Sequence, residues 1–320
     1  MKKEKIFNDL KYQVENFISE NPDWVVIITW PTASGKTSIS ISLAEYFGNV
    51  EIIGADSRQV YQYMDIWTDK VDKQTRQQIK HHQIDIITPD KFYTVWQWKK
   101  STSNIIKKIQ ERQNIPLVAG GTGLYISSIY KNFDIPEVPP DFVLREELKQ
   151  KELKDPWCLH NELQNIDPKQ AEKIHPNSYR YIIRALEIYY KLGKTKSELS
   201  QQKTPEFNIL MVVLWPQKSF SNKLIKDRTS KMYELWLIQE VKDLLDMWYD
   251  ENLQSMQWIG YKQTIEYLKW LVSLDDAVQS TIQATIKYDK RQRTWFRWYY
   301  KDCNISPQKN AQYLFYNNDF

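Results

Sequence analysis

Short runs of apolar residues alternate with stretches of helical spacing in the first 130 residues. The apolar runs are WVVIIT at 24–29, VEIIGA at 50–55 and IPLVA at 115–119. A short, uninterrupted apolar run is typical of a strand that is buried on both faces of a parallel sheet. Helical spacing at 37–47 and 95–112 separates these runs. The alternation predicts right-handed crossovers and therefore an α/β fold with a doubly wound parallel sheet.

The pattern changes after about residue 131. The segment NFDIPEVPPDF is rich in proline and reads as a linker, and FNILMVVLW at 207–215 reads as one more core strand. After this strand, the pattern predicts only helices up to residue 301 and then a loose polar tail. The helical patterns between the linker and this strand lie at 141–154, 168–174 and 179–192. We therefore expect four segments: the first part of the α/β core at 1–135, an inserted helical region at 136–204, a return strand with C-terminal helices that complete the core at 205–302, and a tail at 303–320.

Composition and charge exclude some classes of protein. The formal net charge is +4, which permits a nucleic-acid partner without requiring one. The longest apolar runs are much shorter than the roughly 18 residues of a membrane span. The basic start of the chain has no apolar segment behind it, which argues against a secretory signal. Cys158 and Cys303 form no CxxC pattern, which argues against a zinc ribbon and favours a reducing compartment. We expect a cytoplasmic protein with no membrane contact.

The strand at 24–29 runs into WPTASGKT, which is close to the phosphate-loop pattern GxxxxGK[ST]. Such a loop wraps phosphate oxygens with backbone N–H groups at the positive end of a helix. Lys36 would neutralise phosphate charge, and the hydroxyl of Thr37 would bind Mg²⁺. A fortuitous GKT in a turn is the alternative. The pattern predicts a site for the phosphates of a nucleotide or another diphosphate, formed by Trp30, Pro31, Thr32, Ala33, Ser34, Gly35, Lys36 and Thr37.

Two features set this loop apart from that of an ordinary ATPase. Trp30 stands where the pattern requires glycine, and its side chain is expected to weaken or abolish the site. An ATPase also needs an acidic residue at the end of another core strand, but the strand at 115–119 ends in Gly120 and Gly121. The acid is instead Asp56, directly after the strand at 50–55. This arrangement argues against plain nucleotide hydrolysis.

Several motifs together resemble one family. They are PTASGKT, ADSRQVY at 55–61, MDIWTDK at 64–70, HHQIDI at 81–86, AGGTGLY at 119–125, HPNSYRYIIRALEIYYKLGKTKSEL at 175–199, IGYKQ at 259–263 and KRQRTWFR at 290–297. Their order and spacing resemble the tRNA dimethylallyltransferase (tRNA isopentenyltransferase) family over most of the chain. A GKT motif alone is common, whereas DSRQVY, GGTGLY and IGYKQ on one chain are highly specific.

The resemblance implies a reaction and the roles of several residues. Family members transfer the dimethylallyl group of dimethylallyl diphosphate to N6 of the adenosine 3′ of the anticodon in tRNA, with Mg²⁺. The phosphate loop is then expected to hold the donor diphosphate, not ATP. By resemblance, Asp56 is a catalytic base that accepts or hydrogen-bonds the amine proton, and Thr122 closes the other side. A helix N-cap is the structural alternative for Asp56.

The resemblance also implies contacts with the tRNA. The target adenosine is expected to be flipped into the pocket, against Asp56, Ser57, Arg58, Gln59 and Thr122. Tyr179, Arg180 and Arg184 lie on the inserted helix and are expected to contact the anticodon arm, with Tyr179 available for stacking. For Arg180, an internal salt bridge is the alternative.

For several further basic and titratable residues, the sequence indicates a role less specifically. The resemblance places Arg228 near the diphosphate, but Leu224 stands where the family often has a second arginine. Arg291 and Arg293 either form a solvated basic face or contact phosphates of the tRNA or the donor. The remaining residues, His81, His82 and Asp85, are expected to be structural.

The chain is poor in glycine and rich in tryptophan, with 8 and 13 residues respectively. An average usage of about 7% would give about 22 glycines. By resemblance, several tryptophans stand at glycine positions of the family, whereas Trp295 matches a family tryptophan. We hypothesise that the gene reads UGA as glycine and that the written sequence shows these codons as tryptophan. The affected positions are Trp30, Trp67, Trp157, Trp236 and Trp270, with Trp248 and Trp258 as further cases.

Three functions follow from these observations. The first is transfer of a dimethylallyl group to tRNA, by a monomer whose partners are the anticodon stem-loop and dimethylallyl diphosphate. The second is a small-molecule or nucleotide kinase on the same fold. The third is a tRNA-binding remnant without catalysis, which applies if the tryptophans are genuine.

Overall fold

The computed structural model describes residues 2–29, 35–199, 203–302 and 310–318. The chain divides into two compact units. The first unit comprises Met1–Tyr93, Gln97–Tyr130 and Pro205–Phe320, and the second comprises Thr94–Trp96 and Lys131–Thr204. The phosphate-loop residues Trp30, Pro31, Thr32, Ala33 and Ser34 lie outside the described residues.

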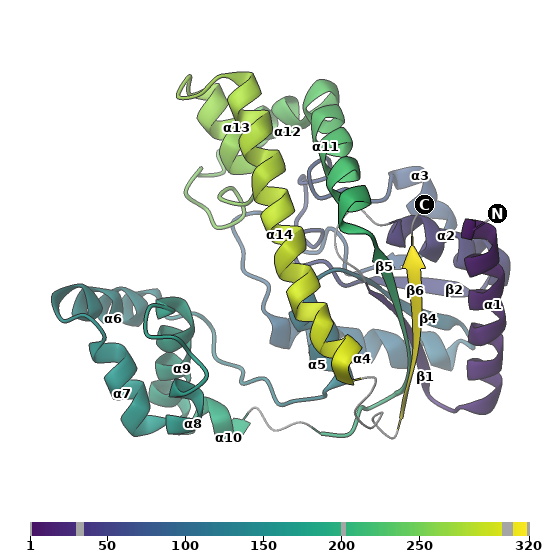
Figure 1. Cartoon of the computed structure of the whole chain (residues 1–320), viewed down its shortest axis with the longest axis horizontal. Helices are drawn as coiled ribbons and strands as arrows, with labels where there is room; N and C mark the ends of the chain where they lie inside the picture. The colour runs from purple at the N-terminus through teal and green to yellow at the C-terminus, as the bar shows by residue number, and fades with distance from the viewer. Residues whose placement is uncertain (1, 30–34, 200–202, 303–309, 319–320) are drawn as a thin grey trace. The chain divides into compact units, whose positions relative to one another are not determined.

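The first unit is built on a parallel sheet (Figure 1). Its six described strands lie in the order β3-β2-β4-β1-β5-β6. Adjacent strands keep a continuous register, in which Val26 of β1 pairs with Leu117 of β4 on one side and Leu210 of β5 on the other. Because all pairs are parallel, the carboxyl ends of the strands meet at one edge of the sheet. The bounds are β1 (Trp24–Thr29), β2 (Val50–Gly54), β3 (His81–His82), β4 (Ile115–Gly120), β5 (Asn208–Pro216) and β6 (Ala311–Asn318).

The apolar runs of the sequence form the central strands because they are buried on both faces. All residues of β1 after the first are buried, and β2 is buried throughout. One face packs against α1 and α2, with Leu10, Phe17 and Leu43 in a common core with Val26 and Ile28. The α/β prediction with a parallel sheet is confirmed.

Helices connect these strands and extend the first unit. The amphipathic helix α1 was not predicted from the sequence. The helix predicted at 95–112 is present as α4. The bounds in this unit, with α4 beginning just outside it, are α1 (Lys2–Glu20), α2 (Lys36–Phe47), α3 (Lys73–Gln78), α4 (Val95–Glu111), α5 (Gly123–Tyr130), α11 (Lys218–Leu235), α12 (Leu237–Asp246), α13 (Tyr261–Leu268) and α14 (Leu274–Asp302).

The expectation of a loose tail after residue 302 was wrong for the described part of that tail. Residues 311–318 form β6, which pairs in parallel with β5 from Ile209↔Ala311 to Pro216↔Asn318. Without β6, the N–H and C=O groups on that side of β5 would have no partner strand. Leu314 and Tyr316 of β6 also pack against the core that contains α1.

The second unit is helical and has its own apolar core. The core includes Leu148, Leu159, Leu163 and Leu186. The helix expected at 168–174 is shorter, because α8 ends at Ala171 and the chain continues in turns. The bounds are α6 (Phe142–Lys154), α7 (Cys158–Ile166), α8 (Pro168–Ala171), α9 (Tyr179–Leu192) and α10 (Lys196–Leu199).

A buried carboxylate ties α6 to α9 within the second unit. Glu187 of α9 is fully buried and accepts hydrogen bonds from Arg145 of α6, from Arg184 and from the backbone N–H of Asp141. Burial alone would raise the pKa of Glu187, but these bonds lower it below its usual value. The ionised carboxylate therefore fixes one helix against the other.

Across the described helices, no segment combines the length and the apolar character needed to cross a bilayer.

Candidate active site

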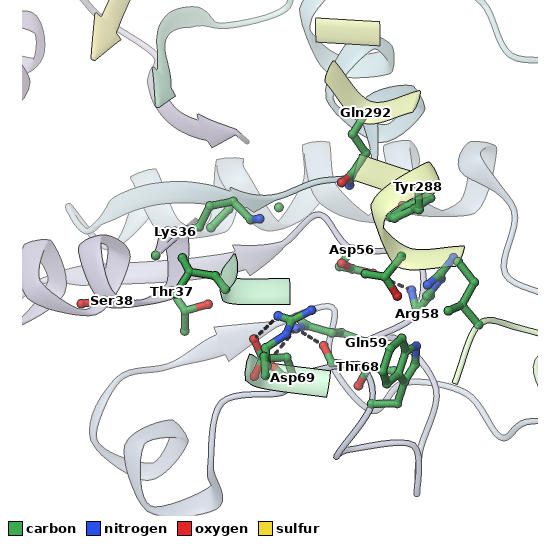
Figure 2. A pocket seen from close by; sticks show the side chains of 18 residues that line it. Lys36, Thr37, Ser38, Asp56, Arg58, Gln59, Thr68, Asp69, Tyr288 and Gln292 are labelled. Atoms are coloured by element: carbon green, nitrogen blue, oxygen red, sulfur yellow. Dashed lines mark hydrogen bonds and ion pairs between the residues drawn. The ribbon is translucent and has the colours of Figure 1, made fainter. Parts of the chain in front are cut away.

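A cavity of about 480 Å³ lies where β1, β2 and β4 end (Figure 2). In open parallel sheets, ligands bind outside the carboxyl ends of the strands. Elements far apart in the sequence line this cavity, all of them in the first unit. The lining residues are Gly35, Lys36, Thr37, Ser38, Asp56, Arg58, Gln59, Trp67, Thr68, Asp69, Ala119, Gly120, Leu224, Arg228, Ile259, Thr285, Tyr288 and Gln292.

One side of the cavity is the start of α2. Gly35 precedes this helix with a φ of 81°, a left-handed conformation that favours glycine, and Lys36 and Thr37 follow it. The first backbone N–H groups of a helix have no intrahelical partner and attract anions. The described part of the predicted phosphate loop therefore lines the cavity through Gly35, Lys36 and Thr37.

The charge of Lys36 is sensitive to its surroundings in the cavity. Burial of its ammonium group lowers its pKa to about 8, although the negative charge of Asp56 opposes this shift. The positive charge of Arg228 lowers the pKa further. A bound diphosphate would favour the protonated form and reverse the effect.

Asp56 lies on another side of the same cavity, directly after β2. Its Oδ1 atom accepts a hydrogen bond from the backbone N–H of Arg58 at 2.9 Å. This bond, two residues along the chain, forms an Asx-turn, and no helix begins there. The alternative of a helix N-cap for Asp56 was therefore wrong.

The ends of β2 and β4 are held together next to Asp56. The hydroxyl of Thr122 accepts a hydrogen bond from the backbone N–H of Ser57 at 2.9 Å. The backbone N–H of Thr122 in turn donates to the carbonyl of Ala55 at 3.0 Å. These bonds bring Asp56, Ser57 and Thr122 together as predicted neighbours, while their catalytic and tRNA-binding roles remain predictions.

Gly120 explains why β4 ends without an acid. A Cβ atom at this position would lie 2.2 Å from the backbone carbonyl carbon and oxygen of Ala55. No side chain fits that distance, so only glycine allows the two strand ends to approach closely. The carboxylates that line the cavity, Asp56 and Asp69, both come from the chain after β2.

Tyr288 and Gln292 of α14 also line the cavity. The guanidinium of Arg58 lies over the ring of Tyr288, at 4.7 Å from the ring centroid, and also near Trp258. Gln292 donates from Nε2 to the carbonyl of Gly121 at 2.9 Å. Gln59 donates to the carbonyls of Thr68 and of the residue after it. Arg58 and Gln59 are thus at the cavity, as predicted.

Arg228 on α11 reaches the cavity and forms an ion pair with Asp69, at 2.8 Å between Nη1 and Oδ2. Leu224, one turn earlier, also lines the cavity and offers no charge. Thr68 and Asp69 also line the cavity, although no site role was expected for them from the sequence. Their place in the MDIWTDK motif was the signal that could have identified them.

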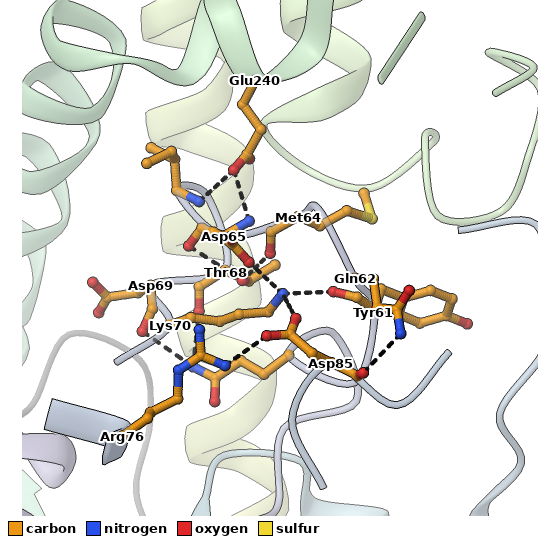
Figure 3. Close-up of polar contacts among 12 residues, drawn as sticks. Tyr61, Gln62, Met64, Asp65, Thr68, Asp69, Lys70, Arg76, Asp85 and Glu240 are labelled. Carbon is orange, nitrogen blue, oxygen red and sulfur yellow. Dashed lines mark hydrogen bonds and ion pairs between the residues drawn. The ribbon is translucent and has the colours of Figure 1, made fainter. Parts of the chain in front are cut away.

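A buried ionic network holds the segment that carries Thr68 and Asp69 (Figure 3). The side chain of Lys70 is almost fully buried, and its Nζ binds Asp65 Oδ1, Asp85 Oδ1 and the carbonyl of Tyr61. Asp85 also binds Arg76, and these bonds lower its pKa although burial alone would raise it. Asp65 and Lys70 lie on either side of Thr68 and Asp69, and the network joins them to Asp85 and to the carbonyl of Tyr61.

Glu240 of α12 supports the same segment from the other side (Figure 3). Its Oε2 accepts hydrogen bonds from the backbone N–H groups of Asp65 and Ile66, both at 2.6 Å, and Tyr261 donates to Oε1. Burial raises the pKa of Glu240 above its usual value, although these hydrogen bonds oppose the shift.

The histidines have structural contacts, in line with the expectation. Nδ1 of His81 lies 2.6 Å from the carbonyl of Ile79, and Nε2 of His82 lies 2.7 Å from Glu51. Burial alone would raise the pKa of Glu51, but bonds from Asn114, His82 and Arg112 lower it to about 2.

Arg293 is a buried anchor of α14. Its guanidinium binds Asp289, the carbonyl of Pro216 and the hydroxyl of Ser221. These contacts join α14 to the end of β5 and to α11. Of the two readings given for Arg291 and Arg293, the exposed Arg291 fits a basic face, whereas Arg293 is neither solvated nor among the residues that line the cavity.

The predicted tRNA-binding residues of the inserted helix lie on α9 in the second unit. Tyr179 and Arg180 occupy its first turn and are exposed. Arg184 donates hydrogen bonds from Nη1 to Glu187 and from Nη2 to the carbonyl of Val138. Contact of these residues with tRNA remains a prediction.

The fold and the site define a P-loop enzyme in which the start of α2, after β1, and the carboxylate of Asp56, after β2, line one cavity. The comparisons with known proteins identify the family. The family model described as IPP transferase matches residues 59–299, and the chain belongs to this family.

Relatives and solved structures agree with this assignment. The chain is 40% identical over 277 residues to a tRNA dimethylallyltransferase from Dictyoglomus turgidum, covering 86% of this chain and 85% of the relative. It is 40% identical over 300 residues to one from Pelotomaculum thermopropionicum, covering 90% and 95%. The structure of a tRNA isopentenylpyrophosphate transferase from Bacillus halodurans matches with a TM-score of 0.63 and 35% identity, over 92% and 90% of the chains. A eukaryotic dimethylallyltransferase acting on tRNA matches with a TM-score of 0.75 and 30% identity, over 93% and 75%.

Proposed function

We propose that this protein transfers a dimethylallyl group from dimethylallyl diphosphate to N6 of the adenosine 3′ of the anticodon in tRNA. The observation that carries this proposal is that Lys36 and Asp56 line one cavity. Lys36 can therefore bind the leaving diphosphate in the same cavity in which Asp56 accepts a proton from the attacking amine. Family membership supplies the reaction class.

The donor side of the reaction uses the start of α2. Lys36 and the backbone N–H groups beside it bind the diphosphate, and Arg228 adds a second positive charge. When the bond between C1 of the dimethylallyl group and the diphosphate oxygen breaks, the diphosphate takes the electron pair. Lys36 stabilises the charge that develops there.

The acceptor side uses the ends of β2 and β4. As the N6 atom of adenosine bonds to C1, it loses one proton, and Asp56 accepts this proton. Thr122 and Ser57 hold the backbone around Asp56, so the carboxylate is positioned before the substrate arrives. The products are dimethylallyl-adenosine in the tRNA and inorganic diphosphate.

The residues at the cavity fit a Mg²⁺ ion that arrives with the diphosphate. Thr37 offers an exposed hydroxyl beside Lys36, and Mg²⁺ commonly keeps several waters and binds substrate phosphates. Within the described ranges, no cluster of three His, Cys, Asp or Glu side chains could hold a metal alone. When bound, the ion would neutralise diphosphate charge, with Thr37 as its protein ligand.

We further propose how the tRNA is held. The flipped adenosine enters the cavity beside Arg58, whose guanidinium is already in contact with Tyr288, and beside Gln59. Tyr179 and Arg180 contact the anticodon arm, with Arg184 on the same helix. The protein acts as a monomer in the cytoplasm.

The test is a transfer assay on the Trp30→Gly form with unmodified tRNA, Mg²⁺ and labelled dimethylallyl diphosphate. Digestion of the tRNA to nucleosides should reveal labelled dimethylallyl-adenosine. Tight binding of both substrates without this product would instead favour the non-catalytic remnant. ATP turnover without isoprenoid would favour the kinase.

A further inference from the structure

Several tryptophans of this chain occupy backbone conformations that favour glycine. In Trp157, Trp248 and Trp270, φ is 70°, 66° and 60°. We infer that these positions hold glycine in the protein that the native cell makes, because its translation reads their codon as glycine. The inference rests on backbone geometry, and it bears on the proposed function through Trp30.

The clearest examples lie at the C-terminal ends of α12 and α13. After α12, the N–H of Trp248 donates to the carbonyl of Leu245, and the N–H of Tyr249 donates to that of Leu244. This pair of bonds is a Schellman motif, whose left-handed residue is usually glycine. Trp248 occupies that left-handed position.

The end of α13 repeats the motif. The N–H of Trp270 donates to the carbonyl of Tyr267, and the N–H of Leu271 donates to that of Glu266. A left-handed conformation brings the Cβ of an L-residue close to the following carbonyl oxygen, which glycine avoids. Two helices of one chain therefore end with tryptophan at the residue position where glycine is most favoured.

Other helices of the same chain show the expected residue. The helices α2 and α9 are capped at their C-terminal ends by Gly48 and Gly193, with φ values of 72° and 65°. Their N–H groups donate to the carbonyls of Ala44 and Tyr189. Glycine at these two ends and tryptophan at the other two have the same backbone conformation.

Packing does not explain the indoles. The side chains of Trp248 and Trp270 are 93% and 89% exposed, and Trp157 is 58% exposed. An exposed indole gains little from burial that would offset the backbone strain. Among the described residues, seven other non-glycine positions have positive φ, and four of them are Asp or Asn, which tolerate this region.

Other tryptophans are well placed, so the substitution affects only part of them. Trp98 is fully buried, stacks on Tyr125 with ring centroids 4.4 Å apart, and donates to the carbonyl of Gly54. Trp295 lies within α14 and donates to Ser127. If UGA codons are written as tryptophan but read as glycine, some written tryptophans should have glycine conformations. The others, from the ordinary tryptophan codon, should be well packed, as Trp98 is.

The same reassignment at position 67 would add space to the cavity. Trp67 lines it, and a Cβ atom built on Gly260 would lie 2.3 Å from the Trp67 ring, so the indole fills the space next to this glycine. Neither Trp67 nor Trp236 has a positive φ, so backbone geometry supports the inference only for the three positions named first. Glycine at position 30 would complete the phosphate-loop pattern.

Peptide mapping by mass spectrometry of the protein from its native cell tests the inference directly. The peptides should contain glycine at 157, 248 and 270 and tryptophan at 98 and 295. Tryptophan at the first three positions would overturn the inference. Glycine at all five would also overturn it, since the codon argument requires two kinds of tryptophan position.

Thermal unfolding of recombinant protein gives an independent readout. The variant with both Trp248→Gly and Trp270→Gly should unfold about 2 °C higher per site than the written sequence, because strain is removed. The control Trp98→Gly should unfold at a lower temperature because it leaves a cavity. A lower unfolding temperature for the double variant would contradict the inference.

These outcomes are separable from the proposed function. Glycine in the native peptides without any isoprenoid transfer would sustain the inference and refute the function. Tryptophan in the native peptides together with isoprenoid transfer would do the reverse.

Discussion

Two sides of the cavity are built in different ways. On the side of Asp56, backbone hydrogen bonds join the ends of β2 and β4 through Ser57 and Thr122. On the side of Lys36 and Arg228, charges influence one another, and burial has lowered the pKa of the lysine. The position of Asp56 on the first side depends on backbone geometry, whereas the charge of Lys36 on the second side depends on pH, salt and the ligand. A base needs an exact position, and a diphosphate site needs charge that responds to binding.

The largest effect is expected from the geometric side. Asp56→Ala should lower turnover by about 10²–10⁴-fold, because no group then accepts the amine proton. Affinity for tRNA, measured by gel shift, should change little. The matched control is Asp227→Ala, an exposed aspartate next to Arg228 that does not line the cavity. Equal losses in both variants would show that Asp56 has no special role.

The next effect is expected on the charged side. Lys36→Met should weaken binding of dimethylallyl diphosphate by about 10–100-fold, since a hydrogen bond to a charged group contributes about 1.5–3 kcal/mol. Isothermal titration measures this affinity. Lys226→Met, on the exposed face of α11, should leave it unchanged.

The pH dependence of donor binding distinguishes the two sides further. In the free protein Lys36 has a pKa of about 8, so it loses its charge as pH rises through that value. The diphosphate binds the protonated form, and the dissociation constant should therefore rise above pH 8. This rise should be absent in Lys36→Met. A flat profile in the parent protein would contradict the role given to Lys36.

Removal of the buried cation in Figure 3 should lower stability. Lys70→Met leaves Asp65 and Asp85 without their shared partner. Breaking a buried pair costs about 3–5 kcal/mol, and the partial exposure of both carboxylates reduces the expected loss to about 2 kcal/mol. Urea unfolding measures the change. In the control Lys91→Met, the exposed pair with Asp90 should contribute less than about 0.5 kcal/mol.

The smallest effect is expected from Asp69→Asn. This change removes the negative charge that pairs with Arg228, and both side chains of the pair are partly exposed. We expect less than about a fivefold change in donor affinity, and salt should reduce it, because such pairs contribute about 1 kcal/mol or less. A change as large as that of Lys36→Met would show that this ion pair, too, is essential to the charged side.

Local patterns were sufficient to predict the strands that form the cavity. The bounds of β1 follow from WVVIIT, and the bounds of β2 and β4 differ by one residue from the predicted runs. Because parallel strands end at one edge, the residues after them could be placed together before the structure was known. Lys36 and Asp56 belong to this predictable group, whereas Thr122 was expected at the site only by resemblance to the family.

Long-range contacts could not be predicted in this way. Glu240 binds backbone N–H groups of Asp65 and Ile66, about 175 residues away, and no periodicity connects them. The pair of Asp69 and Arg228 has a similar separation. These contacts form only after α11 and α12 pack against the segment that follows β2, so their signal lies in the tertiary structure.

The position of β6 has a consequence for synthesis of the protein. This strand follows all the other described helices and strands in the sequence and forms the outer edge of the described sheet, next to β5. Translation proceeds from the N-terminus, and domains form as they emerge from the ribosome. β5 is therefore made well before its partner strand, and its open side can mispair until β6 has been made as well.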